Sequence, residues 1–465
     1  MKVSDFFKEI YRQYRQDIPI LVASAVFLKF SSRWQDSLFG LGFFPLMLFL
    51  FLKIDIFKKF TAFIILLPYA ESRIMPRQLF NIVGLNPINV MFVILIVSLA
   101  LKNNGRVFKR SSYYPAIIVF LIAIFISVLR GNGNLDYSGV GYFLDAFLKP
   151  LQILSCGLVA FVIMEKPQDM RHFLRAIRLS SLILGMWILY RVILLGVGTM
   201  AEMESLQRFS GMHKNVVGFM FTTLLAMNLA IENVNGKKYE KVQSRLFSIL
   251  YILVIMFTFS RQAYATAVLL LSIYAWKKGF KAIVVFVIGF CLFWTFFMPE
   301  QVKRRIYYGT GKGVAMGLAA STTGDIWAGR QEIWAISRPV IKQHFWLGQG
   351  AYTYYRISEF TSEHTSHPHN AYIQSFLDMG LIGSVFFIGF YVFLLFKSWF
   401  LHTRSKSKFI SCYSFGFFLV IVAFLFSGYT GYRFYPYEES YFVWLFLGGL
   451  MWIDENQKRF GKQNA

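Results

Sequence analysis

The residues best suited to chemistry lie in a polar stretch, residues 299–372, between long apolar runs. It holds Gly329-Arg330 and, further on, His367-Pro368-His369-Asn370. A histidine near its ordinary pKa is a natural general base for a sugar hydroxyl. A lipid-embedded surface can hold a fold together, but it cannot do acid–base chemistry on a sugar or a phosphate, whereas this stretch can.

Histidine is concentrated on one side of the predicted membrane. Five of the seven histidines fall there: His213, His344, His364, His367 and His369. His367 and His369 flank a proline, so we expect a stiff local backbone whose two rings point apart. Two alternatives stay open. His367 and His369 are solvated loop residues, or they bind zinc together with His364, which adds a third nitrogen. Asn370 could equally cap the helix that follows or bind substrate.

Four arginines lie near the same side. Arg208 precedes an apolar run that includes Asn215, and Arg261 is wedged between two runs. The guanidinium group is always charged and binds a diphosphate through paired hydrogen bonds, which suits Arg208, Arg261 and Arg330. Arginine at the membrane edge is costly and usually has a function or a fixed partner. The alternatives are snorkelling for Arg261 and structural ion pairs for Arg208 and Arg330. For Arg433 a structural role is preferred.

The composition predicts that membrane helices position these residues. The chain has 465 residues, of which 56% are hydrophobic and 15% charged, and continuously apolar runs recur along it. Lipid-exposed backbone must satisfy its own hydrogen bonds, so the runs predict an all-α polytopic membrane protein with about 12–14 transmembrane helices. The expected spans are 18–30, 38–52, 60–71, 88–101, 114–129, 143–164, 179–197, 215–231, 246–259, 262–276, 282–298, 373–396, 409–427 and 440–453.

Positive charge predicts the orientation of the chain. Five alternate loops hold 19 Lys and Arg, whereas the intervening short loops hold five. The five loops are 102–110, 165–178, 237–245, 277–281 and 397–408. The positive-inside rule places them in the cytoplasm with both termini, and places residues 299–372 on the outer face. The net charge of +24 then comes from Lys and Arg in cytoplasmic loops that fix the orientation of the chain. We therefore expect no nucleic acid partner.

The simplest organisation is one domain with a large helical extracytoplasmic loop. Transmembrane helices cover 1–298, the loop with the catalytic residues covers 299–372, and C-terminal helices with a tail cover 373–465. Inside the loop, Asp325 to Gln343 shows an apolar stripe at helical spacing. The paired glycines of Gly348-Gln349-Gly350 then break the pattern.

Read in order, the motifs resemble those of the O-antigen ligase and O-antigen polymerase superfamily of membrane glycosyltransferases. They are Arg208-Phe209-Ser210-Gly211 with Asn215, Ser260-Arg261, Gly329-Arg330 with Trp334, Gly348-Gln349-Gly350, His369-Asn370 and Gly380-Leu381-Ile382-Gly383. The similarity covers roughly residues 200–395. His213-Lys214 departs from the family pattern, in which an apolar residue and a proline often precede the Asn.

The resemblance implies a GT-C-like fold in the bacterial inner membrane and a donor oligosaccharide or polysaccharide carried on undecaprenyl diphosphate. It implies no nucleotide sugar, no cofactor and no required metal. By position, His369 would be the catalytic base, and Arg208 and Arg330 would bind the diphosphate together with Arg261. The residues expected to support the site or to bind the acceptor are Asn370, His367, Asn215 and Gly329.

Other classes of protein remain in view. A transporter would share the helix count, but it would not need a long outer insert, and its polar residues should lie at mid-membrane. An inactive assembly partner would tolerate substitution of His369 and Arg330. Among enzymes, a ligase uses a lipid A–core sugar as acceptor and is slightly favoured, whereas a polymerase extends another lipid-linked repeat.

Overall fold

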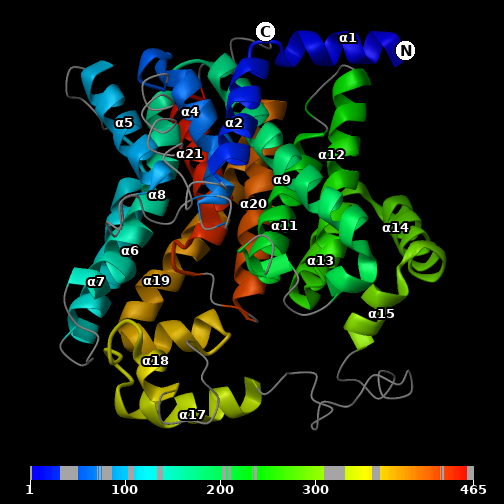
Figure 1. Cartoon of the computed structure of the whole chain (residues 1–465). Coiled ribbons are helices and arrows are strands. Elements are labelled where there is room, and N and C mark those ends of the chain that lie inside the picture. Colours follow the sequence, from blue (N-terminus) through cyan, green and yellow to red (C-terminus); the bar gives the residue numbers. More distant parts are fainter. Residues whose placement is uncertain are drawn as a thin grey trace.

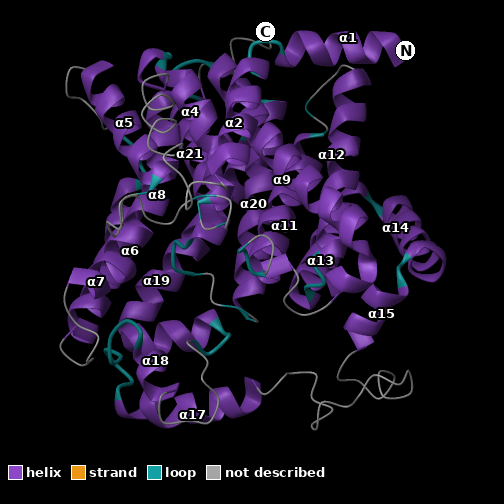
Figure 2. Cartoon of the chain, viewed as in Figure 1, coloured by secondary structure: helices purple, strands orange, loops and turns teal. Residues whose placement is uncertain are grey.

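Helices and short loops make up the part of the chain that the computed structural model describes, and no strand occurs in that part (Figure 2). The described residues are 3–31, 51–70, 72, 75, 86–102, 109–132, 140–201, 206–207, 211–232, 234, 238–307, 330–358, 367–429, 431 and 434–457. The all-α fold class predicted from the sequence is confirmed.

The helices follow the apolar runs. Those of the first half are α1 (Val3–Tyr14), α2 (Ile18–Ser31), α4 (Ile56–Leu66), α5 (Pro87–Lys102), α6 (Tyr114–Asn132), α7 (Val140–Phe143), α8 (Lys149–Ile163), α9 (Pro167–Ala201) and α11 (Lys214–Ile231). Those of the second half are α12 (Lys238–Phe257), α13 (Arg261–Lys278), α14 (Phe280–Leu292), α15 (Glu300–Tyr307), α17 (Arg330–Gln343), α18 (Thr353–Ser358), α19 (Ala371–Arg404), α20 (Lys408–Gly428) and α21 (Tyr441–Glu455). Each expected span coincides with a helix, except 38–52, most of which lies outside the described residues.

Six helical segments of the described part are long and apolar enough to cross a membrane. They are Tyr114–Gly131, Gly141–Ile163, Pro167–Val197, Lys214–Ile231, Ala371–Arg404 and Lys408–Gly428. Two shorter apolar helices, Pro87–Lys102 and Phe280–Phe296, accompany them. The protein is therefore a polytopic membrane protein, while the total of about 12–14 spans and the GT-C-like arrangement stay predictions.

The centre of the bundle is α11, which packs against α20, α12 and α13, while α19 packs against α20 and α6. Every residue of α11 from Val217 to Ile231 is buried. By contrast, α14 has no buried residue although it is apolar on all sides, as a lipid-facing helix would be. The two ends of the bundle also differ. α1 and the start of α12 lie at one end, and α17 and α18 lie at the other (Figure 1).

The insert that contains α17 and α18 is fastened to α19 at a break in that helix. Gly380 has φ 63 and ψ −168, so carbonyl groups just before it lose their helical partners. The insert replaces them: the Gln349 amide donates to the Leu377 carbonyl at 2.8 Å. The Gly350 amide donates to the Asp378 carbonyl at 3.0 Å. The break is thereby satisfied by backbone groups, as a helix in or near lipid requires.

The amides after the break are satisfied in the same way. The Leu381 amide donates to the Phe345 carbonyl at 2.7 Å. The two backbones approach so closely that a Cβ on Gly380 would overlap the Gly348 amide nitrogen, and both glycines have positive φ. Only glycine meets both conditions, which explains why glycines recur at this crossing.

Candidate active site

Asn370 fixes the entry into α19. Its side-chain oxygen accepts hydrogen bonds from the amides of Tyr372 (2.9 Å) and Ile373 (3.1 Å), and the residue is 4% exposed. Of the two roles expected for Asn370, the capping role is the one observed. The residue before it, His369, has φ 53, which is uncommon for a residue other than glycine. Such strained residues cluster at functional sites.

The rings of His367 and His369 lie against each other, with centroids 4.0 Å apart and planes inclined at 59°. The expectation that they point apart is wrong, because the left-handed backbone at His369 turns its ring back toward His367. Both residues are half-buried. The loop is also held from α17, where Trp334 Nε1 donates to the Pro368 carbonyl at 3.0 Å. The pair is therefore positioned by two helices.

A second part of the site joins the N-termini of α11 and α13. Ser260 caps α13: its Oγ accepts from the Ala263 amide at 3.3 Å and donates to Asn215 Oδ1 at 2.7 Å. His213 caps α11 by accepting the Asn215 amide at 3.2 Å on Nδ1. His213, where the sequence departs from the family pattern, therefore acts as the cap of α11. Two helix N-termini, each with partial positive charge, lie side by side.

The third part is a pair of arginines from distant segments. Arg261 is the first residue of α13, and Arg330 is the first described residue of α17. Burial and, after it, the nearby Arg261 cation lower the pKa of Arg330. Both causes disfavour the charged form, so the two guanidinium groups are close enough to repel each other. An anion bound between them would relieve that repulsion.

The C-terminal end of α20 connects these parts. Gln262, next to Arg261, donates from Nε2 to the Ser427 carbonyl at 2.8 Å. Trp334 packs edge-on against Tyr429, with ring centroids 5.8 Å apart. α13 and α17 therefore meet at the same helix end, which brings the arginine pair and the histidine loop into one region.

Most predicted site residues that the structure describes fall into these contacts: His367 with His369, Asn215 with Ser260, and Arg261 with Arg330. The predicted or weighed residues outside the described part are Arg208, Gly329, His364 and Arg433. Within the described part, no group of three or more His, Cys, Asp or Glu side chains could hold a metal ion. The proposed borders of the insert at 299 and 372 stay a prediction.

Sequence reasoning assigned no role to Asp378, which the structure places next to the histidines. Asp378 is 1% exposed and accepts hydrogen bonds from Gln374 Nε2 (2.6 Å) and the Tyr435 hydroxyl (2.9 Å). These three residues and His367 line a cavity of about 30 Å³. A signal was available, because an ionisable residue inside an apolar run is by default a functional candidate.

Comparison with known proteins agrees with this geometry. Residues 246–388 match the family model described as O-Antigen ligase. No curated protein matches the chain. The matched segment runs from α12 into α19, and so it contains Arg261, Arg330 and the loop from His367 to Asn370. Residues 246–388 of this polytopic helical membrane protein are therefore similar to the O-antigen ligase family.

Proposed function

We propose that the chain is an inner-membrane glycosyltransferase that moves a glycan from undecaprenyl diphosphate to an acceptor hydroxyl on the outer face. The observation that carries the proposal is that α13 and α17 meet at one end of α20, which brings Arg261, Arg330 and the strained His369 into one region. The match to a family described as O-Antigen ligase supports a lipid A–core sugar as the acceptor.

In the proposed reaction His369 takes the proton of the acceptor hydroxyl, and the hydroxyl oxygen attacks the anomeric carbon of the donor sugar. The bond between that carbon and the diphosphate oxygen breaks. Undecaprenyl diphosphate leaves with one additional negative charge, which Arg261 and Arg330 neutralise through charge-assisted hydrogen bonds. Direct displacement of this kind inverts the anomeric centre. Arg208 is proposed as a further diphosphate ligand on the resemblance alone.

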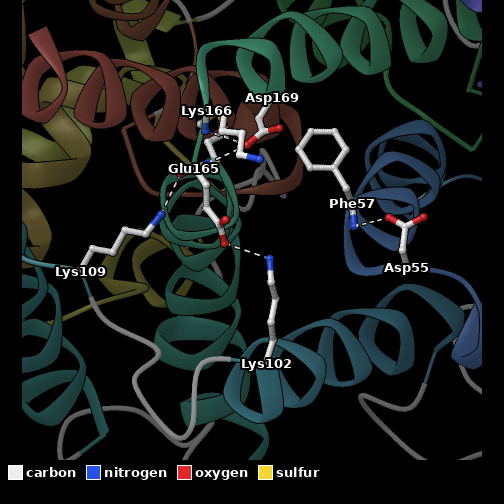
Figure 3. A network of polar contacts seen from close by, with 8 residues as sticks. Asp55, Phe57, Lys102, Lys109, Glu165, Lys166 and Asp169 are labelled. Carbon is white, nitrogen blue, oxygen red and sulfur yellow. Dashed lines mark hydrogen bonds and ion pairs between the residues drawn. The ribbon is translucent and has the colours of Figure 1, made fainter. Parts of the chain in front are cut away.

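The proposed orientation puts the basic loops in the cytoplasm. Figure 3 shows two of them, where Lys102 pairs with Glu165 at 2.9 Å and Lys109 donates to the Met164 carbonyl at 2.7 Å. α17 and α18 lie at the opposite end of the bundle and would face the periplasm (Figure 1). The lipid tail of the donor would then lie among the helices while its diphosphate reaches the arginines at the membrane edge.

Purified protein in detergent tests the proposal in two reactions. Both contain an undecaprenyl-diphosphate oligosaccharide; one adds a lipid A–core acceptor, and the other contains the lipid-linked repeat alone. Transfer to the core, lost in His369→Ala, is the expected result. A ladder of repeats without core would make the protein a polymerase. Absence of product in both reactions, with donor binding intact, would overturn glycosyl transfer and favour a transporter.

A further inference from the structure

A cavity of about 30 Å³ lies beside the histidine pair. Its floor is formed by Asp378, Gln374 and Tyr435, which are all buried, and its rim includes the half-buried His367 and Tyr352. A space of this size holds one or two groups as large as a water molecule. It is therefore too small for a sugar ring but large enough for one of the ring's substituents.

Two oxygens of the floor lack a hydrogen-bond donor from the described part of the chain. Asp378 Oδ2 accepts from Gln374 and Tyr435, but Asp378 Oδ1 is buried without a partner. Gln374 Oε1 is buried without a partner as well. The Thr353 amide donates to the Gly350 carbonyl at 3.3 Å and also lies close enough to the Asp378 carboxylate to act as a weak second donor. Buried acceptors of this kind favour a ligand that brings donors.

We propose that this cavity is a subsite for a hydroxyl or hydroxymethyl group of the acceptor sugar. Such a group supplies the O–H donor that Asp378 Oδ1 and Gln374 Oε1 lack, and its size suits the cavity. Aromatic rings line the opening, since Tyr352 and Tyr437 are both half-buried lining residues, and aromatic walls with a few polar anchors are typical of small-molecule sites.

The position of the cavity assigns it to the acceptor rather than to the donor. His367 forms part of its wall, and the His367 ring contacts the ring of His369, the proposed base. A sugar anchored in the cavity thus presents a neighbouring hydroxyl to His369. The arginine pair that would hold the donor diphosphate does not line the cavity. This inference rests on the proposed glycosyl transfer.

The rim is built to keep its shape. Tyr352, which lines the cavity, has φ 63, and His369, whose ring contacts the lining residue His367, has φ 53. Tyr352 is also packed edge-on against Tyr142, with ring centroids 5.9 Å apart. Strained residues persist only where surrounding structure fixes them, and a fixed rim is what selection among sugars requires.

Two variants test the subsite. Asp378→Asn keeps the volume of the side chain, and Gln374→Leu removes the amide oxygen. In an acceptor titration at saturating donor, we expect each variant to raise the acceptor KM about tenfold and to change kcat less than about threefold. A separate donor titration should give an unchanged donor KM. Ser384→Ala is the matched control, because Ser384 is a buried α19 residue with an unpartnered hydroxyl outside the cavity; its acceptor KM should equal that of the wild type.

Equilibrium binding of the delipidated core oligosaccharide is measured in parallel, and its Kd should also rise about tenfold in both variants. If Asp378→Asn does not fold, Gln374→Leu decides. A rise in donor KM instead, or a loss of thermal stability alone with acceptor KM and Kd unchanged, would overturn the subsite. A wild type without transfer would overturn the proposed function, whereas wild-type transfer with unchanged acceptor binding in both variants would overturn the subsite alone.

Discussion

The two ends of the helix bundle differ in how their charged side chains are arranged. At the end with the basic loops, ion pairs are present: Lys102 lies 2.9 Å from Glu165, and Lys397 lies 2.9 Å from Asp454. At the end with α17, burial and the neighbouring cation of Arg261 both lower the pKa of Arg330. A solvated pair such as Lys102 and Glu165 contributes little to stability. Arg261 and Arg330 are therefore a candidate site for an anion.

The carboxylates of the two ends also differ in their hydrogen bonds. At the basic end, Asp169 Oδ2 accepts from the amides of Glu165 and Lys166, each at 2.8 Å (Figure 3). At the other end, Asp378 and Gln374 each keep one oxygen without a described donor. Buried oxygens without a described partner occur at the basic end as well, for example Gln243 Oε1 and Ser407 Oγ. What distinguishes Asp378 and Gln374 is that their unpartnered oxygens belong to residues that line a cavity. Substitutions at the α17 end should affect transfer, whereas a substitution at the basic end should not.

Substitution of His369 should have the largest effect on activity. His369→Ala removes the proposed base, and we expect transfer to fall by about 100-fold or more. Single-turnover rates in detergent measure this loss. His344→Ala, also in the insert but C-terminal to α17, is the control and should retain wild-type rates. Near-normal product from His369→Ala would show that the base is another group.

Gly380→Ala tests the backbone crossing. A Cβ there would overlap the Gly348 backbone, and φ 63 is unfavourable for alanine. We expect a loss of about 1–3 kcal/mol or more in stability, together with loss of transfer. Gly389→Ala lies on the same helix with no neighbour within 4 Å of its Cβ. Thermal denaturation in detergent should leave Gly389→Ala unchanged, and equal melting of the two variants would contradict the crossing.

The arginine pair is tested by changing its geometry without its charge. Arg330→Lys keeps the cation but loses the bidentate fork, so we expect the donor KM to rise about tenfold, and further in Arg330→Ala. Arg338→Lys is the control, since Arg338 is exposed on the same helix. Donor titration at fixed acceptor provides the measurement. Full activity of Arg330→Lys would argue against bidentate binding of the diphosphate.

A smaller effect is expected at Trp334. Trp334→Phe keeps an aromatic ring but removes the hydrogen bond to the Pro368 carbonyl, which positions the histidine loop. The kcat should fall roughly threefold to tenfold, since one neutral hydrogen bond is worth about 1 kcal/mol, while the donor KM stays constant. Trp346→Phe, a largely exposed residue of the same insert, should behave as the wild type. An unchanged kcat would mean that the loop is held by Asn370 alone.

The smallest effect is expected at the basic end. Hydrogen bonding from Lys102 lowers the pKa of Glu165 below its ordinary value of 4.5, so this pair stabilises the protein above that pH. The contribution is lost as the pH falls through the lowered pKa. Glu165→Gln should therefore cost less than about 1 kcal/mol at neutral pH, with normal transfer. The difference in melting temperature from wild type should shrink in acid. A loss of transfer in Glu165→Gln would contradict the view that only the α17 end takes part in activity.

Sequence patterns predicted the helices because hydrophobic length is a local property. The runs that became α11, α19 and α20 could be recognised without knowing their neighbours. The capping role of Asn370 was also within reach, because a cap acts on the next turn of its own helix. The orientation of the two histidine rings could not be predicted. It depends on the left-handed φ of His369, which the flanking proline does not indicate.

Contacts between distant segments could not be predicted from one sequence. The hydrogen bond from Ser260 to Asn215 and the proximity of Arg261 to Arg330 join segments that are separated along the chain. Asp378 was visible as a charge in an apolar run, but its cavity is completed by Tyr435 from another part of the chain. Only the folded arrangement shows which polar residues share a site.

The crossing at Gly380 has a consequence for engineering and for evolution. The insert and α19 complete each other's backbone hydrogen bonds, and Ser127 of α6 adds one to the Asp378 carbonyl at 3.0 Å. The insert is therefore not a detachable cap that could be exchanged between relatives at its ends. A chimaera with a junction between the insert and α19 would combine two halves of one structural joint, and α6 would have to come from the same parent because Ser127 bonds to both.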